Sequence, residues 1–301
     1  MRWVHEPSPG IDVAWFDSPR DLMEAPVGKA NRTKFYRKDL GTSHFMDPHC
    51  YHMRDLDWSG TRGGMAAVLD AMTGRAAWPE GETHWANAMA QIKAKPLPKI
   101  ESVRRRRRRG EEGAELDADR MYAGDFDSMW IRTQREASRT PRHLRSLINV
   151  GGTGEKPAAE MLWAGVAGAL LVELLRKSGR NSEVHVFTVA SYAYECGTDC
   201  ALVVKVKDAT QRLDVRALLA WAAMPGSFRS ALFHGRATNP TKQLTSGLGS
   251  NTTTKDTTAL LKRIDPGASA AASVVVPKLD SLADAQRWLA DIWSSFARGE
   301  R

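Results

Sequence analysis

The second half of the chain alternates short apolar runs with longer segments in which apolar residues recur at helical spacing. Apolar runs of strand length, suited to burial on both faces of a sheet, occur at residues 143–150, 182–194, 201–208 and 272–279. Helical spacing occurs at residues 157–177, 213–224 and 281–299. Pro225 and Gly226 end the second of these helices, and a short further helix is expected over residues 227–235.

This alternation predicts an α/β fold, a doubly wound and mostly parallel sheet flanked by helices, over residues 140–301. The tight turn "CGTD" joins two of the strands as an antiparallel hairpin at the edge of the sheet. A stretch rich in Thr, Ser and Gly, residues 237–258, is expected to be a surface loop.

The first half is less regular. Residues 1–57 are rich in Pro, Asp, Arg and His with little periodicity, which predicts irregular structure with short elements. Residues 63–72 and 81–92 predict a pair of helices, because Gly and Pro between them interrupt a continuous helix. We therefore expect a helical and irregular segment over residues 1–100 and an arginine-rich, acidic connector over residues 101–139.

Composition narrows the class of protein only a little. A chain of 301 residues can bury a substantial core, and its formal charge of +8 favours anionic partners by steering without identifying one. The N-terminus has acidic residues and prolines where a signal peptide needs an apolar core, and the longest apolar run, residues 161–172, is short for a bilayer. Three cysteines are too few for a disulfide framework, so we expect a cytoplasmic protein without membrane partners.

A glycine-rich turn, "GGTGEKP", separates the first predicted strand of this domain from its long helix. It is not a P-loop, because Lys156 is displaced from the position that reaches a terminal phosphate and Glu155 places negative charge at the anion site. Pro157 also removes one amide from the helix N-terminus. The dinucleotide-binding pattern fails as well, because its third glycine is missing.

The order of elements resembles the von Willebrand factor A-type (vWA) domain, in which the loop after the first strand carries Asp-x-Ser-x-Ser and helps to coordinate Mg²⁺. The aligned positions are Asn149, Gly151 and Thr153, so the carboxylate has become an amide and only Thr153 keeps a ligand-capable oxygen. The resemblance covers residues 140–299 and implies a degenerate metal site with at most weak Mg²⁺ binding. Another open α/β sheet with a glycine turn stays an alternative.

In vWA families such a domain mediates protein–protein contacts and is seldom an enzyme. The chain is similar to uncharacterised phage and bacterial proteins and to the vWA subunits that work beside MoxR-type or cobaltochelatase-type AAA+ ATPases, which implies an adaptor with a protein partner in the host cytoplasm. Ligands of open α/β sheets bind at the carboxyl ends of the strands. The expected partner-binding residues are Asn149, Gly151, Gly152, Thr153 and Thr188.

A loop dense in metal-capable groups supports a different hypothesis, a zinc or other transition-metal site and, with it, a metal-dependent hydrolase. Its candidate ligands are His44, Asp47, His49, Cys50 and His52, of which His44, Asp47 and His49 would serve the hydrolase. Their spacing matches no common zinc motif, and an exposed loop explains them equally well.

A run of arginines is the feature most suited to nucleic acid, because guanidinium groups bind phosphate oxygens bidentately. The run consists of Arg104, Arg105, Arg106, Arg107, Arg108 and Arg109. Interleaved aromatic residues are missing, and nine acidic residues from Glu101 to Glu136 lie close enough in sequence to neutralise it. A solvated linker is the alternative to a nucleic-acid contact.

The chain shows little that favours catalysis. Ser227, His234 and Asp214 lie near one another in sequence without the pattern of a nucleophile elbow. The tryptophans fall among apolar residues, so core packing is expected, and Trp58 and Trp78 are the two expected to attach the N-terminal segment to the sheet.

Overall fold

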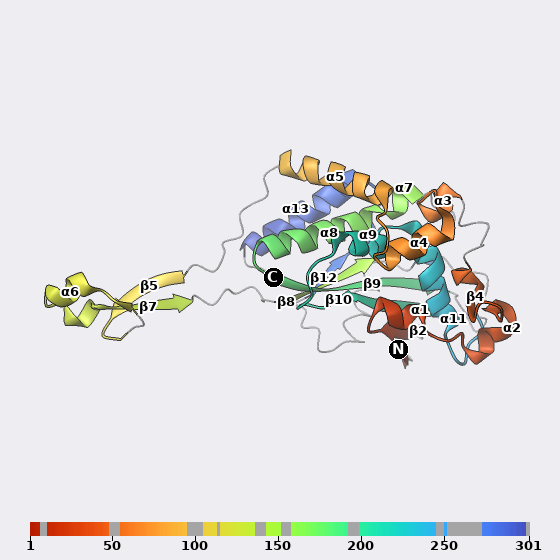
Figure 1. Ribbon diagram of the computed structural model, residues 1–301, viewed down its shortest axis with the longest axis horizontal. Coiled ribbons are helices and arrows are strands. Elements are labelled where there is room, and N and C mark those ends of the chain that lie inside the picture. Colours follow the sequence, from red (N-terminus) through yellow and green to blue (C-terminus); the bar gives the residue numbers. More distant parts are fainter. Residues whose placement is uncertain are drawn as a thin grey trace.

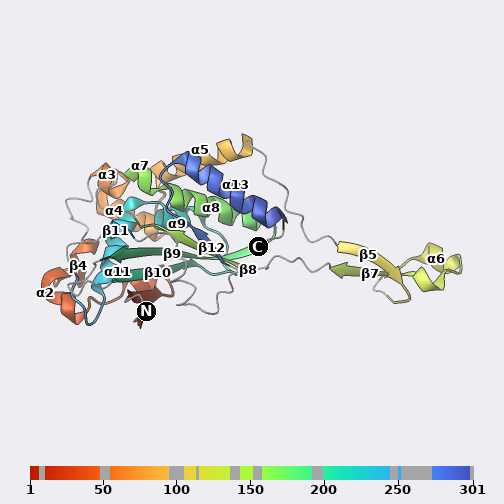
Figure 2. The same ribbon diagram turned by 180° about the vertical axis from the view of Figure 1, so that it is seen from behind.

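The computed structural model describes residues 1–6, 11–47, 55–94, 105–112, 115–135, 143–151, 158–191, 199–244, 250–251 and 273–298. A mixed β-sheet runs through the main body, and the helices that contact the sheet gather on one of its faces (Figures 1 and 2). The fold is α/β, as the alternation of strands and helices predicted.

Six strands form the main sheet in the order β1-β2-β10-β9-β8-β12. Their bounds are β1 Arg2–Glu6, β2 Ile11–Phe16, β8 His143–Asn149, β9 Asn181–Ser191, β10 Asp199–Lys207 and β12 Ser273–Val276. The β2/β10, β9/β8 and β8/β12 pairs are parallel, and β1/β2 and β10/β9 are antiparallel. The short β11, Ser250–Asn251, pairs with the end of β9. All four predicted strands are present.

The helices also follow the predicted pattern. The helical pair is α4, Gly64–Met72, and α5, Pro79–Ala94, and the long apolar helix is α8, Trp163–Lys177, preceded by the short α7, Ala158–Met161. Later in the chain lie α9 Val215–Ala222, α10 Pro225–Ser227, α11 Phe233–Ala237 and α13 Leu282–Arg298. A π-helical turn, η5 Phe228–Leu232, joins α10 to α11. Smaller elements are α1 Pro19–Met23, η1 Lys29–Asn31, α2 Arg32–Phe35, β3 Tyr36–Arg37, β4 Thr42–Ser43, η2 His44–Met46 and α3 Leu56–Ser59.

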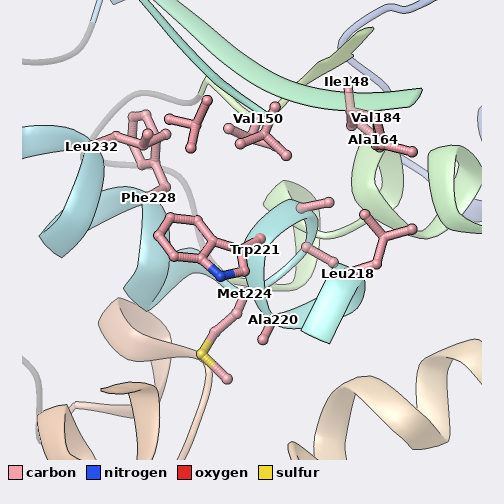
Figure 3. Packing of buried hydrophobic residues seen from close by; sticks show 14 of the residues in the cluster. Ile148, Val150, Ala164, Val184, Leu218, Ala220, Trp221, Met224, Phe228 and Leu232 are labelled. Carbon is pink, nitrogen blue, oxygen red and sulfur yellow. The ribbon is translucent and has the colours of Figure 1, made fainter. Parts of the chain in front are cut away.

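The main core lies between the sheet and the layer of α8 and α9 (Figure 3). Trp221 of α9 is buried there, and its indole Nε1 donates a hydrogen bond to the carbonyl oxygen of Met72, 2.9 Å away, so α4 is fixed to the same core. Helices α8 and α9 approach closely at Gly165, where a Cβ atom would lie 2.0 Å from the carbonyl oxygen of Ala222. This contact requires glycine, because any side chain would overlap backbone atoms.

The opposite face of the sheet carries a second, smaller cluster of buried apolar residues, because alternate side chains of a strand point to opposite faces. Its members are Ile11, Val13, Leu147, Phe187, Val189, Ala201 and Val203, each at most 4% exposed. The strands are thus apolar on both faces, as expected for a buried sheet. The described helices that contact the sheet lie on one face, which differs from the doubly wound arrangement predicted, in which helices cover both faces.

The N-terminal residues differ from the expectation of irregular structure, because β1 and β2 extend the main sheet. Strand β2 pairs in parallel with β10, so the β9/β10 hairpin is internal and not at the edge as predicted. The fully buried Asn31 then links this segment to the C-terminal half: its side chain bonds to the carbonyls of Asn239 (3.2 Å) and Lys242 (3.0 Å) and to the amide of Leu244 (2.7 Å). The main body therefore combines residues from both sides of the predicted boundary at residue 140.

The two tryptophans expected to attach the N-terminal segment contact α3 and the α10–η5 region. Trp78 is buried, and its Nε1 donates to the carbonyl oxygen of Gly60, 2.9 Å away. The guanidinium carbon of Arg229 lies 4.3 Å from the ring centroid of Trp58, and Arg229 Nη1 donates to the carbonyl of Trp58. The Trp58–Arg229 contacts thus attach the N-terminal segment to η5, and not to the sheet as predicted, whereas the Trp78 bond joins two residues within that segment.

The predicted connector contains a small sheet of its own, β5-β7-β6, which the figures draw apart from the main body (Figures 1 and 2). Its strands are β5 Arg105–Gly110, β6 Glu115–Leu116 and β7 Trp130–Arg135, with α6 Ala118–Tyr122 and η4 Phe126–Ser128 at the far end. We call residues 105–135 the arm.

By length and composition alone, Ala158–Lys177 could cross a bilayer, although the prediction from residues 161–172 judged the apolar run too short. Its most apolar 18-residue window is 61% buried inside the protein, packed between the sheet and α9. It serves as the central helix of the core.

Candidate functional site

The carboxyl end of β8 carries the first residue of the predicted site. Asn149 is the last residue of the strand and is 6% exposed. Its side-chain oxygen accepts a hydrogen bond from the amide of Gly151, 3.0 Å away, and the amide of Val150 still bonds to the carbonyl of Phe187. Asn149 therefore ends the strand in an Asx turn, a local bond that fixes the start of the glycine-rich loop.

The neighbouring strand contributes Thr188, which is fully buried. Its hydroxyl oxygen accepts a hydrogen bond from Nη2 of Arg236, 3.1 Å away. Arg236 comes from α11, is 1% exposed, and has its guanidinium carbon 5.9 Å from the ring centroid of Phe228 and 5.4 Å from that of Phe233. A permanently charged arginine thus lies inside the protein beside the predicted site. Sequence reasoning missed it because nothing in the pattern of α11 marks a buried charge.

The strand register separates the predicted residues. Asn149 aligns with Phe187 in the parallel β8/β9 ladder, so its side chain and that of Thr188 point to opposite faces of the sheet. Thr188 is buried, so it can hold Arg236 but cannot itself touch a partner. Gly152 and Thr153 lie outside the described residues. The structure brings Asn149, Gly151 and Thr188 to one edge of the sheet without grouping their side chains.

A carboxylate does lie near this edge, on a strand that sequence analysis treated as irregular. Asp12 of β2 aligns with Cys200, which in turn pairs with Ala190 near the carboxyl end of β9. Asp12 is buried, and its oxygens meet Nζ of Lys242 (2.8 Å), Nδ1 of His5 (2.7 Å) and the amide nitrogen of Asn239 (3.3 Å).

These contacts determine what the edge can do chemically. The aspartate is already paired with Lys242, so its charge is engaged within the protein and is not offered to a divalent cation. Among the described residues there is no group of three His, Cys, Asp or Glu side chains placed to hold a metal ion. The described edge offers polar groups and backbone amides, and the charges of Asp12 and Lys242 are paired with each other.

The structure describes two of the residues predicted for the metal-binding loop, and His49, Cys50 and His52 lie outside its described part. His44 packs against the rings of Phe35 and Phe45, and burial lowers the pKa of His44 below its usual range. Asp47 is buried, and its Oδ2 lies 2.8 Å from Nη1 of Arg37. These two side chains are thus engaged with an aromatic cluster and an arginine.

The arginine run, where the structure describes it from Arg105, is a strand of the arm and not a linker. In the antiparallel β5/β7 ladder, Arg105 aligns with Arg135 and Arg108 with Arg132, and no acidic residue stands opposite Arg105–Gly110 in this described ladder. Because strand residues alternate between faces, both faces of the ribbon carry arginine positions. Arg104 lies outside the described residues.

The acidic residues of the arm cluster at its far end. Asp117 Oδ2 lies 3.3 Å from Nη2 of Arg109, and Asp125 Oδ2 lies 2.6 Å from Nη1 of Arg120. Hydrogen bonds from Ser128 and then Arg120 lower the pKa of Asp125. Neutralisation of the arginine run by acidic residues was the predicted alternative to nucleic-acid binding. It is seen at Arg109, the last arginine of the run, which pairs with Asp117.

The residues weighed for catalysis each have a different partner. Asp214 caps α9 by accepting bonds from the amides of Arg216 and Ala217, and the Ser227 hydroxyl donates to the carbonyls of Ala220 and Met224. Nδ1 of His234 is 2.8 Å from the hydroxyl oxygen of Ser43. Both members of that pair are completely buried, so substrate has no access to them.

Fold and site together define a protein with an α/β body, a polar strand edge and an arginine-bearing arm. The chain belongs to the family described as Domain of unknown function (DUF7192), whose model matches residues 25–291. The match runs through the N-terminal helices, the arm and the C-terminal half, so one family unit spans all three predicted regions. No curated protein and no solved structure matches the chain.

Proposed function

We propose that this protein is a non-enzymatic adaptor of vWA type, which binds a protein partner at the carboxyl edge of β8 and β9. The observation that carries the proposal is the strand arrangement. Strand β8 lies between β9 and β12 and is parallel to both, and β10 pairs antiparallel with the far side of β9. An antiparallel β9/β10 hairpin is what the vWA resemblance implies, although its place inside the sheet differs from the predicted edge. Strands β2 and β1 extend it beyond the resemblance.

The chemistry of the edge supports partner binding without a metal. In a vWA domain an aspartate at the position of Asn149 anchors Mg²⁺, whereas here the amide oxygen is bonded to Gly151. That local bond uses the oxygen that would otherwise be offered to a cation. The resemblance suggests an AAA+ ATPase as the partner, and a phage or bacterial origin of the chain.

Restoring the missing ligands tests the assignment of the edge. The double variant Asn149→Asp/Gly151→Ser recreates Asp-x-Ser-x-Thr with Thr153, and we expect its unfolding free energy to rise with Mg²⁺, by about 2.7 kcal/mol at a hundred times Kd. The wild type should not respond. The matched control Asn149→Ala/Gly151→Ser lacks the acid and should not respond either. A double variant that ignores Mg²⁺ while folding normally would remove the support for a vWA-type edge.

Binding itself is tested with a purified AAA+ ATPase of the native host. Asn149→Ala releases the Asx turn that shapes the glycine-rich loop, so we expect weaker capture in biolayer interferometry. Arg216→Gln, an exposed position on α9, is the control. If neither Asn149→Ala nor Thr153→Ala alters capture, the contact lies elsewhere.

A second candidate function is nucleic-acid binding through the arm, and the strand register of β5 favours it. A two-stranded ribbon fits the major groove of a duplex, and the register gives β5 and β7 arginine positions on both faces, a composition that favours phosphate binding. Exposed Tyr122 and Phe126 at the far end add aromatic surface that the run itself lacks.

Salt dependence separates this candidate from non-specific attraction to a basic protein. Arg105, Arg107 and Arg109 share one face of the ribbon, and replacing all three by Gln should reduce the slope of log K against log salt by up to about 3 on duplex DNA. Fluorescence anisotropy with duplex DNA, duplex RNA and single strands gives the slope. Replacing three exposed arginines of the main body, Arg62, Arg75 and Arg216, removes the same charge. Equal loss in both triple variants would contradict a binding arm.

A further inference from the structure

A basic cavity of about 600 Å³ lies at the opposite end of the sheet from the predicted partner surface. It opens where α8 ends and β9 begins, and the loop between β10 and α9 closes it. Its cationic side chains are Arg176, Arg180, Lys207 and Arg212, against one carboxylate, Glu173. The volume falls within the range of small-molecule sites.

The single carboxylate is already occupied. Glu173 Oε1 and Oε2 accept hydrogen bonds from Arg176 Nη2 and Nε, both at 2.8 Å, and Oε1 also lies 3.4 Å from Nζ of Lys177. These contacts, led by the Arg176 hydrogen bonds, lower the pKa of Glu173. The positive charge of the other three cations therefore remains available to a ligand.

Arg180 and Lys207 have no carboxylate partner among the residues that line the cavity; Asp208, next to Lys207 in the chain, attracts it electrostatically but has its Oδ1 3.0 Å from Nζ of Lys205. Arg180 lies over the ring of Phe296, its Nη1 has no hydrogen-bond partner, and burial lowers its pKa. Lys207 Nζ donates to the carbonyls of Ser182 and Asp208, both 2.8 Å away, and burial is the main cause that lowers its pKa. A shift in strand register between Lys205 and Lys207 separates these two lysines, which would otherwise share a face.

Neutral groups complete the cavity as hydrogen-bond donors. Ser182 and Thr210 supply hydroxyls, and Asn181 and Gln211 supply amides. The side-chain oxygen Oε1 of Gln211 already accepts a hydrogen bond from the backbone amide of Asp208. The side-chain NH₂ group of Gln211 is therefore the part available to a ligand acceptor. Arginine with hydroxyl and amide donors is the combination that binds phosphate oxygens.

We propose that this cavity binds a small phosphate-bearing molecule with at least two negative charges, held by Arg180, Lys207 and Arg212. The site is separate from the carboxyl edge and from the arm, so it does not depend on either proposed function. The cavity lies at the amino end of β9 and the carboxyl end of the antiparallel β10, whereas ligands of parallel α/β sheets usually bind at the carboxyl ends of the strands. The positive charge of its own side chains accounts for binding there.

Inorganic pyrophosphate is the probe, measured by isothermal titration calorimetry with the full chain at fixed ionic strength. The wild type should bind it saturably and in preference to sulfate. Arg212→Gln removes an exposed side chain whose loss does not threaten the fold, and it should weaken binding by about tenfold or more, as should Arg180→Gln. Arg216→Gln, the matched control outside the cavity, should change affinity less than about twofold.

Three outcomes of this titration would overturn the proposal, and a fourth comes from the arm variant. They are no saturable binding by the folded wild type, equal affinity for sulfate, and equal losses in Arg212→Gln and Arg216→Gln. A fourth test separates the cavity from the arm: the Arg105/Arg107/Arg109 variant should retain pyrophosphate binding. If that variant loses it, the phosphates bind to the arm and the cavity is not the site.

Discussion

The buried histidine of α11 makes stability depend on pH in a way that one substitution can isolate. His234 is completely buried, and burial is the main cause that lowers its pKa to about 4. The carbonyls of Leu22 and Ala25 oppose the shift, although Nε2 of the ring has no hydrogen-bond partner of normal geometry. Folding therefore requires the neutral imidazole.

The sign follows from proton linkage. In the unfolded chain the histidine has a pKa of about 6.5, so below that pH the unfolded state binds a proton. The folded state does not bind it until the pH approaches about 4. The stability associated with neutral His234 is fully present above about pH 6.5 and is lost as the pH falls toward about 4. With these two pKa values the loss between about pH 7.5 and about pH 5 is about 2 kcal/mol.

Urea unfolding of the wild type and His234→Gln across this pH range measures the effect. Both proteins share every other titrating group, so the difference between their unfolding free energies should change by about 2 kcal/mol in favour of the variant at the lower pH. Ser43→Ala is the control, because it removes the 2.8 Å contact with Nδ1 while keeping the imidazole, and its pH dependence should match the wild type. Parallel curves for wild type and His234→Gln would refute the argument.

Further substitutions test the packing that joins the parts of the main body, each by chemical denaturation at neutral pH. Gly165→Ala should destabilise by about 2–3 kcal/mol, because the overlap with the Ala222 carbonyl outweighs the helix propensity gained. Asn31→Leu should destabilise by about 3 kcal/mol or more, because it leaves buried backbone carbonyl and amide groups without the hydrogen bonds that Asn31 makes to them. Trp58→Ala should cost about 2 kcal/mol by uncovering the Arg229 guanidinium, and Trp58→Phe should recover most of it. A cost under about 0.5 kcal/mol for any of them would mean that its contact carries no net stability.

The proposed site could be predicted only in part. The glycine turn after β8 marked the edge of the sheet, and Asn149 lies there as expected, because a strand followed by a turn and a helix fixes local geometry. Arg236 and Asp12 could not be found from sequence: each is an ordinary charged residue until the fold places it beside Thr188 or Lys242. Their burial is a property of distant segments that meet.

The sequence by itself determined the class of fold, because apolar runs of strand length and apolar stripes at helical spacing are local patterns with few structural solutions. Strands β8, β9, β10 and β12 and helices α4, α5, α8, α9 and α13 all arose at the predicted places. Tertiary structure alone decided that β1 and β2 extend the sheet and that the arginine run pairs with β7. Strand partners are chosen by backbone hydrogen bonds between segments far apart in the chain, which the spacing of residues along one segment does not specify.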